Sequence, residues 1–166
     1  MKKNDEKIEK FNVTFNAQNT LICGRDEDLL TVVSQELKKL NAKGNTVYIT
    51  DPYLFPINCD MDYEDDLKTL LRNLEASKII YCAGRIRNQS LYTAIQNDLQ
   101  TQNIQMTFDA RLTDCHDRFW FCLNTDKCMV FGTSLNGIGK KICRIDELKA
   151  DEVAVLKAEL KSRGIL

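Results

Sequence analysis

The stretch HDRFWFCLNTDKCMVFGTSLNGIGKK, from His116 to Lys141, holds the only histidine of the chain and its densest run of polar and glycine residues. An aromatic-rich run covers 118–123, turn-forming residues occupy 124–127, and a second apolar run covers 128–131. Short apolar runs separated by turn residues are typical of a β-hairpin. The stretch therefore predicts two antiparallel strands followed by a glycine-containing loop, with the rest of the chain as their scaffold.

Alternation along the first predicted strand separates polar from apolar side chains, because successive residues of a strand point to opposite faces. His116 and Arg118 are expected to share one face, which places an imidazole beside a permanent cation. The opposite face carries residues that can fill a core: Phe119, Phe121 and Leu123. The loop after the second strand supplies hydroxyls, an amide and flexible backbone, at Gly132, Thr133, Ser134 and Asn136. Such a loop can close over an anion, and the combination suits a phosphoryl group.

These residues resemble the signature of the phospholipase D superfamily, His-x-Lys followed by a turn aspartate and Gly-Ser-x-Asn. His116 matches the nucleophile, Arg118 stands where the family has lysine, and Asp126 is the nearest turn acid. Gly132 with Ser134 and Asn136 matches the end of the signature. In this chain Asp126 lies farther from His116 than in the family, and one residue is inserted between Gly132 and Ser134.

The phrases HDRF and GTSLNGIGKK are also similar to small bacterial phospholipase D-like domains, many of them carried on mobile elements. The resemblance is confined to this stretch of the chain. It implies an α/β fold in which a central mixed β-sheet is flanked by helices on both faces.

The first functional hypothesis is a metal-independent phosphodiesterase or nuclease, because the resemblance implies a histidine that attacks phosphorus and forms a phosphohistidine intermediate. His116 would be this nucleophile, Arg118 would clamp the phosphate oxygens, and Ser134 and Asn136 would hydrogen-bond the phosphate or the imidazole. A second histidine, the general acid, would have to come from another copy of the chain. This hypothesis predicts a homodimer and needs no cofactor.

The second hypothesis is a phospholipase D-like binding module that keeps the pocket and has lost turnover. Its anion site would bind a phosphoinositide, a nucleotide or nucleic acid, or the domain would serve for assembly with a protein partner. The basic residues assigned to that site are Arg118, Arg85, Arg87, Lys140 and Lys141. A third interpretation makes His116 an ordinary core histidine of the hairpin.

The composition is that of an ordinary globular protein, with 43% hydrophobic residues and a net charge of −1 among 166 residues. The near-neutral charge gives no overall attraction to nucleic acid, so any such binding must be local. Residues 1–10 form a charged leader without the apolar core of a signal peptide, and no run is long enough for a membrane helix. The sequence predicts a cytoplasmic protein with one domain over residues 11–166.

Seven cysteines without a CxxC pair favour reduced core residues over a disulfide framework or a zinc knuckle. Cys115 beside His116 raises the alternative of a metal site or of a thiol with its base. Neighbouring residues of a strand point to opposite faces, which favours a structural thiol.

Hydrophobic periodicity outlines the remaining elements. Helical spacing predicts helices over 26–40, 62–76, 90–101 and from 146 or 149 to 163. Short β-prone runs predict strands over 46–50, 78–83, 104–112 and 141–145, and a strand or hairpin within 11–23. Strands that alternate with helices, followed by strands without helices between them, indicate a layered α/β domain.

Two strand ends add secondary candidates, because ligands of open α/β sheets bind beyond the carboxyl ends of the strands. Asp51 ends one predicted strand in the phrase Asp51-Pro52-Tyr53, and Arg85 and Arg87 follow another. Asp51 could line a site, although Asp-Pro is also ordinary turn chemistry. The two arginines could hold a phosphate or simply be solvated.

Overall fold

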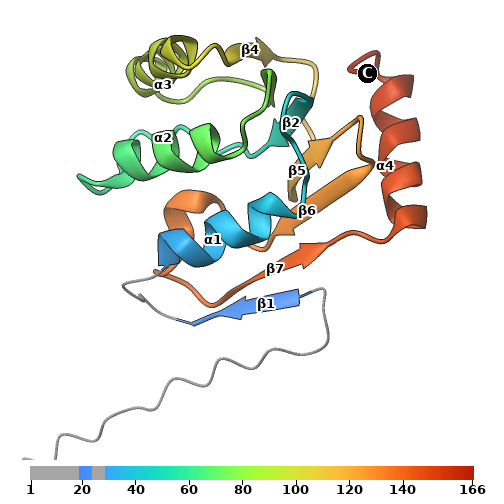
Figure 1. The fold of residues 1–166 in the computed structure, drawn as a ribbon, viewed down its shortest axis with the longest axis horizontal. Coiled ribbons are helices and arrows are strands. Elements are labelled where there is room, and N and C mark those ends of the chain that lie inside the picture. The colour runs from blue at the N-terminus through green and yellow to red at the C-terminus, as the bar shows by residue number, and fades with distance from the viewer. Residues whose placement is uncertain (1–18, 24–28) are drawn as a thin grey trace, which may run out of the picture.

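The computed structural model describes residues 19–23 and 29–166, and Figure 1 shows their arrangement. In chain order the elements are β1 (Asn19–Ile22), α1 (Leu29–Lys38), β2 (Thr46–Thr50), α2 (Tyr63–Asn73), β3 (Lys78–Cys82), α3 (Gln89–Thr101), β4 (Gln105–Asp109), β5 (Arg118–Cys122), β6 (Lys127–Phe131), the 3-10 turn η1 (Leu135–Gly137), β7 (Cys143–Glu147) and α4 (Ala150–Ser162). The predicted leader and the alternating residues before position 19 lie outside the described residues.

One seven-stranded mixed sheet, with the order β1-β7-β6-β5-β2-β3-β4, organises the described chain. β2, β3 and β4 run parallel, as expected for strands joined through the helices α2 and α3. β5 pairs antiparallel with β2, and the strands from β5 to β7 form an antiparallel meander that β1 completes. The prediction of an α/β layered architecture is confirmed, and the predicted hairpin is the pair β5 and β6.

Helices cover both faces of this sheet (Figure 1). α1, α2 and α3 lie over one face, where their leucines join a core with Val47, Ile49 and Trp120. α4 covers the other face, where Val153 and Leu160 pack in a second core with Tyr48 and Phe121. Alternate residues of β2 and β5 thus enter different cores, as the period of two requires. Phe119, Phe121 and Leu123 belong together on the α4 face, as the alternation predicted.

The ends of two helices show how local chemistry sets element bounds. The side chain of Asn88 accepts a hydrogen bond from the Leu91 backbone N–H (3.0 Å) and caps α3, so this helix starts one residue before the predicted Ser90. Of the two starts considered for α4, the later one is correct. Asp146 belongs to β7, whereas the Lys149 N–H donates to Glu152 Oε2 (2.9 Å) just before the helix begins.

The seven cysteines are all free thiols, and Cys82, Cys122, Cys128 and Cys143 are buried. This agrees with the expectation of reduced core residues. Among the described helices, none combines the length and apolar character that crossing a bilayer requires.

Candidate functional site

The topology brings most of the predicted site residues to one edge of the sheet. β2 and β3 end at this edge, β5 begins there, and β6, which is antiparallel to β5, ends there. We call it the polar edge. It carries residues that follow or precede these strands, namely Asp51, Arg85, Arg87, His116, Arg118, Gly132, Thr133 and Ser134. Asp126 is instead in the β5–β6 turn at the opposite edge, where it has a positive φ and forms an ion pair with Lys157 (2.7 Å). Its position agrees with the structural turn role.

Asp51 and Arg118 lie opposite each other at the polar edge. Thr50 pairs with Phe119 in the β2–β5 register, so the next residues along, Asp51 and Arg118, come opposite each other. Asp51 is only 1% exposed, and Arg118 is half-buried. Asp51 Oδ2 and Arg118 Nε are both buried without a hydrogen-bond partner among the described residues, and Trp120 Nε1 on the same face is a third such atom. Buried polar atoms without partners are rare in folded proteins and often mark ligand sites.

The environment of Asp51 raises the pKa of its carboxyl group to about 6, mainly because burial disfavours the charged form. Three groups oppose this shift: the Tyr53 N–H, which donates to Oδ1 (2.9 Å), the charge of Arg118 and the Leu135 N–H. The increase in pKa caused by burial is larger than the decrease caused by these three groups together. Asp51 therefore changes its charge in the near-neutral range, next to an arginine.

Arg118 is a cation without an assigned anion. No group in the described part of the chain accepts a hydrogen bond from its guanidinium, and it makes no ion pair there, although it acts electrostatically on Asp51. A guanidinium presents several N–H donors in a planar fork that matches two oxygens of a phosphate or carboxylate. Arg118 is thus equipped to take an oxyanion from outside the chain.

His116 is exposed and lies two residues before β5 begins. The strand alternation therefore places Arg118 but does not extend to His116. Within the described residues no hydrogen bond holds the imidazole. His116 acts electrostatically on Asp114, a residue already paired with Arg163. The interpretation of His116 as a buried core histidine is wrong, because the side chain is exposed.

Cys115 does not act together with His116. Its thiol is half-buried and makes hydrogen bonds to the Asp117 carbonyl (3.2 Å) and to Thr50 Oγ1 (3.6 Å). Burial also raises the pKa of the thiol, which disfavours the nucleophilic thiolate. The structural interpretation of Cys115 agrees with these contacts.

The loop after β6 is held by its own backbone. The Gly132 N–H donates to the Arg144 carbonyl (2.9 Å), and the Gly137 N–H donates to the Ser134 carbonyl (2.8 Å). Ser134 is buried at the start of η1, and its hydroxyl makes no hydrogen bond within the described chain. Of the predicted loop residues, Ser134 thus remains available to a ligand beside Leu135, whose N–H acts on Asp51.

Gly137 allows the two ends of this loop to approach closely. A Cβ added at Gly137 would lie 2.3 Å from Thr133 Oγ1, closer than atoms can approach. We therefore expect Gly137→Ala to lower the free energy of unfolding by about 1–3 kcal/mol, measured by urea denaturation. The double variant with Thr133→Ala should recover part of the loss, because it removes the clashing atom. A double variant no more stable than Gly137→Ala would show that this contact is not the cause.

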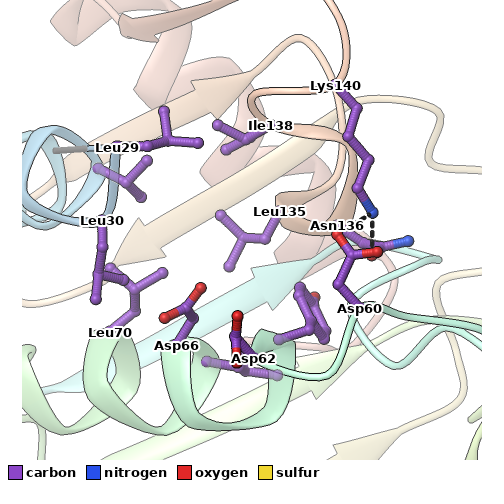
Figure 2. A pocket seen from close by; sticks show the side chains of 13 residues that line it. Leu29, Leu30, Asp60, Asp62, Asp66, Leu70, Leu135, Asn136, Ile138 and Lys140 are labelled. Carbon is purple, nitrogen blue, oxygen red and sulfur yellow. Dashed lines mark hydrogen bonds and ion pairs between the residues drawn. The ribbon is translucent and has the colours of Figure 1, made fainter. Parts of the chain in front are cut away.

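Asn136 and Lys140 are turned to a different part of the surface. Lys140 Nζ donates to Asn136 Oδ1 (3.2 Å) and pairs with Asp60 (3.0 Å), as Figure 2 shows. Both residues line a cavity of about 470 Å³ between α1, α2 and the η1 loop. No hydrogen bond or ion pair links either of them to Arg118 or His116 in the described chain. These two predicted residues are therefore separated from the rest of the candidate site.

Arg85 and Arg87 line a second cavity, of about 300 Å³, together with Thr50 and Cys115. Arg87 is held in place, since its Nε donates to the Pro52 carbonyl (3.0 Å) and its guanidinium lies over the Tyr53 ring, 4.3 Å from the centroid. Arg85 is exposed. The two arginines thus stand at the polar edge beside Cys115, the residue that precedes His116.

The sequence motifs pointed neither to the larger cavity nor to the acidic residues at the start of α2. Asp62, Asp66 and Leu70 all line that cavity. Their spacing of four residues, which puts them on one face of a helix, is the signal that could have identified them.

Comparisons with known proteins provide little evidence about the function of this site. No family model and no curated protein matches the chain. One similar solved structure is that of TrmBL2, an archaeal chromatin protein described as showing a novel mode of DNA binding. It has 11% sequence identity and a TM-score of 0.43 over 90% of this chain and 53% of the other. The chain thus spans about half the length of that structure, and its function has to be argued from its own site.

Proposed function

We propose that the protein is a phospholipase D-like module that binds a phosphate group at the polar edge of its sheet without cleaving it. The observation that carries this proposal is the state of Arg118, a half-buried cation whose Nε has no acceptor in the part of the chain that the structure describes. A buried donor without a partner costs free energy, and a phosphate oxygen would supply the missing acceptor. Hydrogen bonds between charged groups are also the stronger kind.

Neighbouring groups complete a phosphate site around Arg118. Ser134 has a hydroxyl without a hydrogen bond in the described chain, and Gly132 and Thr133 lie at the same edge. His116 is exposed two residues before β5 and brings an imidazole to the same edge. The observed layers, a mixed sheet with helices on both faces, support the phospholipase D-like part of the proposal.

Binding is favoured over chemistry by the surroundings of His116. A catalytic histidine is normally oriented by a hydrogen bond to a third group. The described residues provide none to His116, and Asp114 is engaged by Arg163. Asn136, which the family pattern would bring to the phosphate, is hydrogen-bonded by Lys140 instead. The ligand is thus a phosphate-bearing molecule such as a nucleotide, a nucleic acid or a phospholipid headgroup, recognised through its phosphate.

A phosphodiesterase acting as a homodimer is the second candidate, and the exposure of His116 favours it. An exposed imidazole at the polar edge is free to face the same residue of a second copy, which would then supply the general acid. Measuring the mass by light scattering tests this candidate. A stable monomer at micromolar concentration would eliminate it, because the chain contains only one histidine.

Calorimetric titration of the full chain with inorganic phosphate and with a dinucleotide tests the proposed binding. We expect saturable binding of both, with competition between them. In parallel, bis(p-nitrophenyl) phosphate should not be cleaved in the presence of a chelator. The absence of saturable binding at millimolar ligand would refute the proposal. Cleavage that disappears in His116→Ala would replace it with the phosphodiesterase.

A further inference from the structure

The cavity of about 470 Å³ is lined by three separate parts of the fold. α1 contributes Leu29, Leu30 and Val33, the region of α2 contributes Asp60, Asp62, Tyr63, Asp66, Leu67 and Leu70, and the η1 loop contributes Leu135, Asn136, Ile138 and Lys140. Its volume of about 470 Å³ is within the usual range for small-molecule sites. Because most of the walls are apolar, the cavity suits a ligand with an apolar body.

The polar side of this cavity is acidic. Figure 2 shows the carboxylates of Asp62 and Asp66 directed into the space that Leu70 and Leu135 also face. Neither carboxylate makes an ion pair within the described residues, whereas Lys140, the cation of the cavity, is held by Asp60 (3.0 Å) and Asn136 (3.2 Å). Among the described residues, no cation is therefore paired with either of these two carboxylates.

The helix dipole favours all the acidic residues in the first turn of α2, Asp66 included, but their side chains have different surroundings. The other two first-turn acids are Glu64 and Asp65. Both are paired with Lys68, at 2.7 Å and 3.7 Å, away from the cavity. Asp66 faces the cavity instead, and its pKa is raised by burial and by the charges of Asp62 and Asp65. A cation placed there would relieve this repulsion.

We infer that this cavity binds a small organic cation, an ammonium group carried on an apolar body, with Asp62 and Asp66 as its counter-ions. The apolar body would lie against Leu30, Leu70 and Leu135. A metal ion fits less well, because no group of three or more His, Cys, Asp or Glu side chains in the described ranges is arranged to hold one. The inference does not depend on the proposed phosphate site, which uses Arg118.

Three probes with the same phenyl body and different charge test this inference on the full chain: phenethylammonium, 2-phenylethanol and 3-phenylpropanoate. Binding is measured by NMR titration. The ammonium should bind tightest and the carboxylate weakest. Asp62→Asn and Asp66→Asn should each weaken the ammonium about threefold, and the double variant about tenfold, as expected for partly exposed charges. The affinity for the neutral alcohol should stay unchanged.

Asp65→Asn is the matched control, because it removes the same charge from the same helix without touching the cavity. It should weaken ammonium binding clearly less than Asp66→Asn does, because Asp65 acts on Asp66 only through its charge and does not line the cavity. Bound ammonium should also lower the pKa of Asp66, which the same spectra report. Equal binding of the ammonium and the alcohol, an equal effect of Asp65→Asn and Asp66→Asn, or no binding of phenethylammonium at millimolar concentration would each overturn the inference.

Discussion

Between about pH 4 and about pH 7.5, the free energy of unfolding of Asp51→Asn should rise by about 2–3 kcal/mol relative to that of the wild-type protein. The reason is the burial of Asp51, which raises the pKa of its carboxyl group from 3.8 to about 6. Asparagine has a similar shape and does not titrate. The difference between the two proteins therefore isolates the contribution of this one carboxyl group.

The sign of the effect follows from proton binding. Because the folded state holds the Asp51 proton more tightly than the unfolded state, the stabilisation is fully present below the unfolded pKa of 3.8. It is lost as the pH rises through about 6. Asp109 and Asp114, whose pKa values are lowered by arginine partners, have the opposite dependence in both proteins. Their contributions to stability are the same in both proteins and therefore cancel in the difference between Asp51→Asn and the wild-type protein.

Urea denaturation of both proteins over this pH range measures the effect. Asp65→Asn is a suitable control, since Asp65 is an exposed carboxylate on α2 and its removal should give a small difference that varies little with pH. If the stability difference between Asp51→Asn and the wild-type protein does not change with pH, Asp51 is not the buried titrating group described above.

Replacing Arg118 with glutamine should weaken phosphate binding by about 1.5–3 kcal/mol, which is roughly a 10- to 150-fold loss of affinity. Glutamine keeps one N–H donor group but removes the charge and the fork. The phosphate affinity of Arg118→Lys should lie between those of the wild-type protein and Arg118→Gln. Lysine keeps the charge as a point charge but lacks the planar donors. Calorimetric titration with inorganic phosphate measures all three proteins.

Arg72→Gln is the matched control, because Arg72 makes an exposed ion pair with Asp98 on the surface of α2 and α3. It should bind phosphate as the wild-type protein does. An independent readout comes from Asp51, whose pKa Arg118 lowers. That pKa should rise in Arg118→Gln, seen by carboxyl NMR. Equal losses in Arg72→Gln and Arg118→Gln would mean that overall charge, not a site, governs binding.

Much of the fold could be predicted because its elements depend on local patterns. The apolar runs around the turn at Asp126 predicted the hairpin, and alternation correctly placed Phe119 and Phe121 on one face. The alternation was less informative before the first residue of β5. β5 begins at Arg118, so the same alternation could not place His116.

The candidate site was predictable in part. Asp51 and Arg118 were named separately, one as a strand end and the other within the motif, and nothing in their spacing of 67 positions suggested that they face each other. Their proximity results from the antiparallel pairing of β2 with β5. Asn136 and Ser134 lie two residues apart, yet the 3-10 turn directs them to different surroundings.

The sequence by itself determined the helices, the strands and the polar residues at the strand ends, because side-chain period and turn chemistry act over a few neighbouring residues. The tertiary structure alone decided which of these polar residues share an environment. Strand order placed Asp51 opposite Arg118, and the packing of α1 and α2 against the η1 loop formed the acidic cavity. Charge state and ligand preference depend on burial and on neighbours distant in the chain, which only the folded chain brings together.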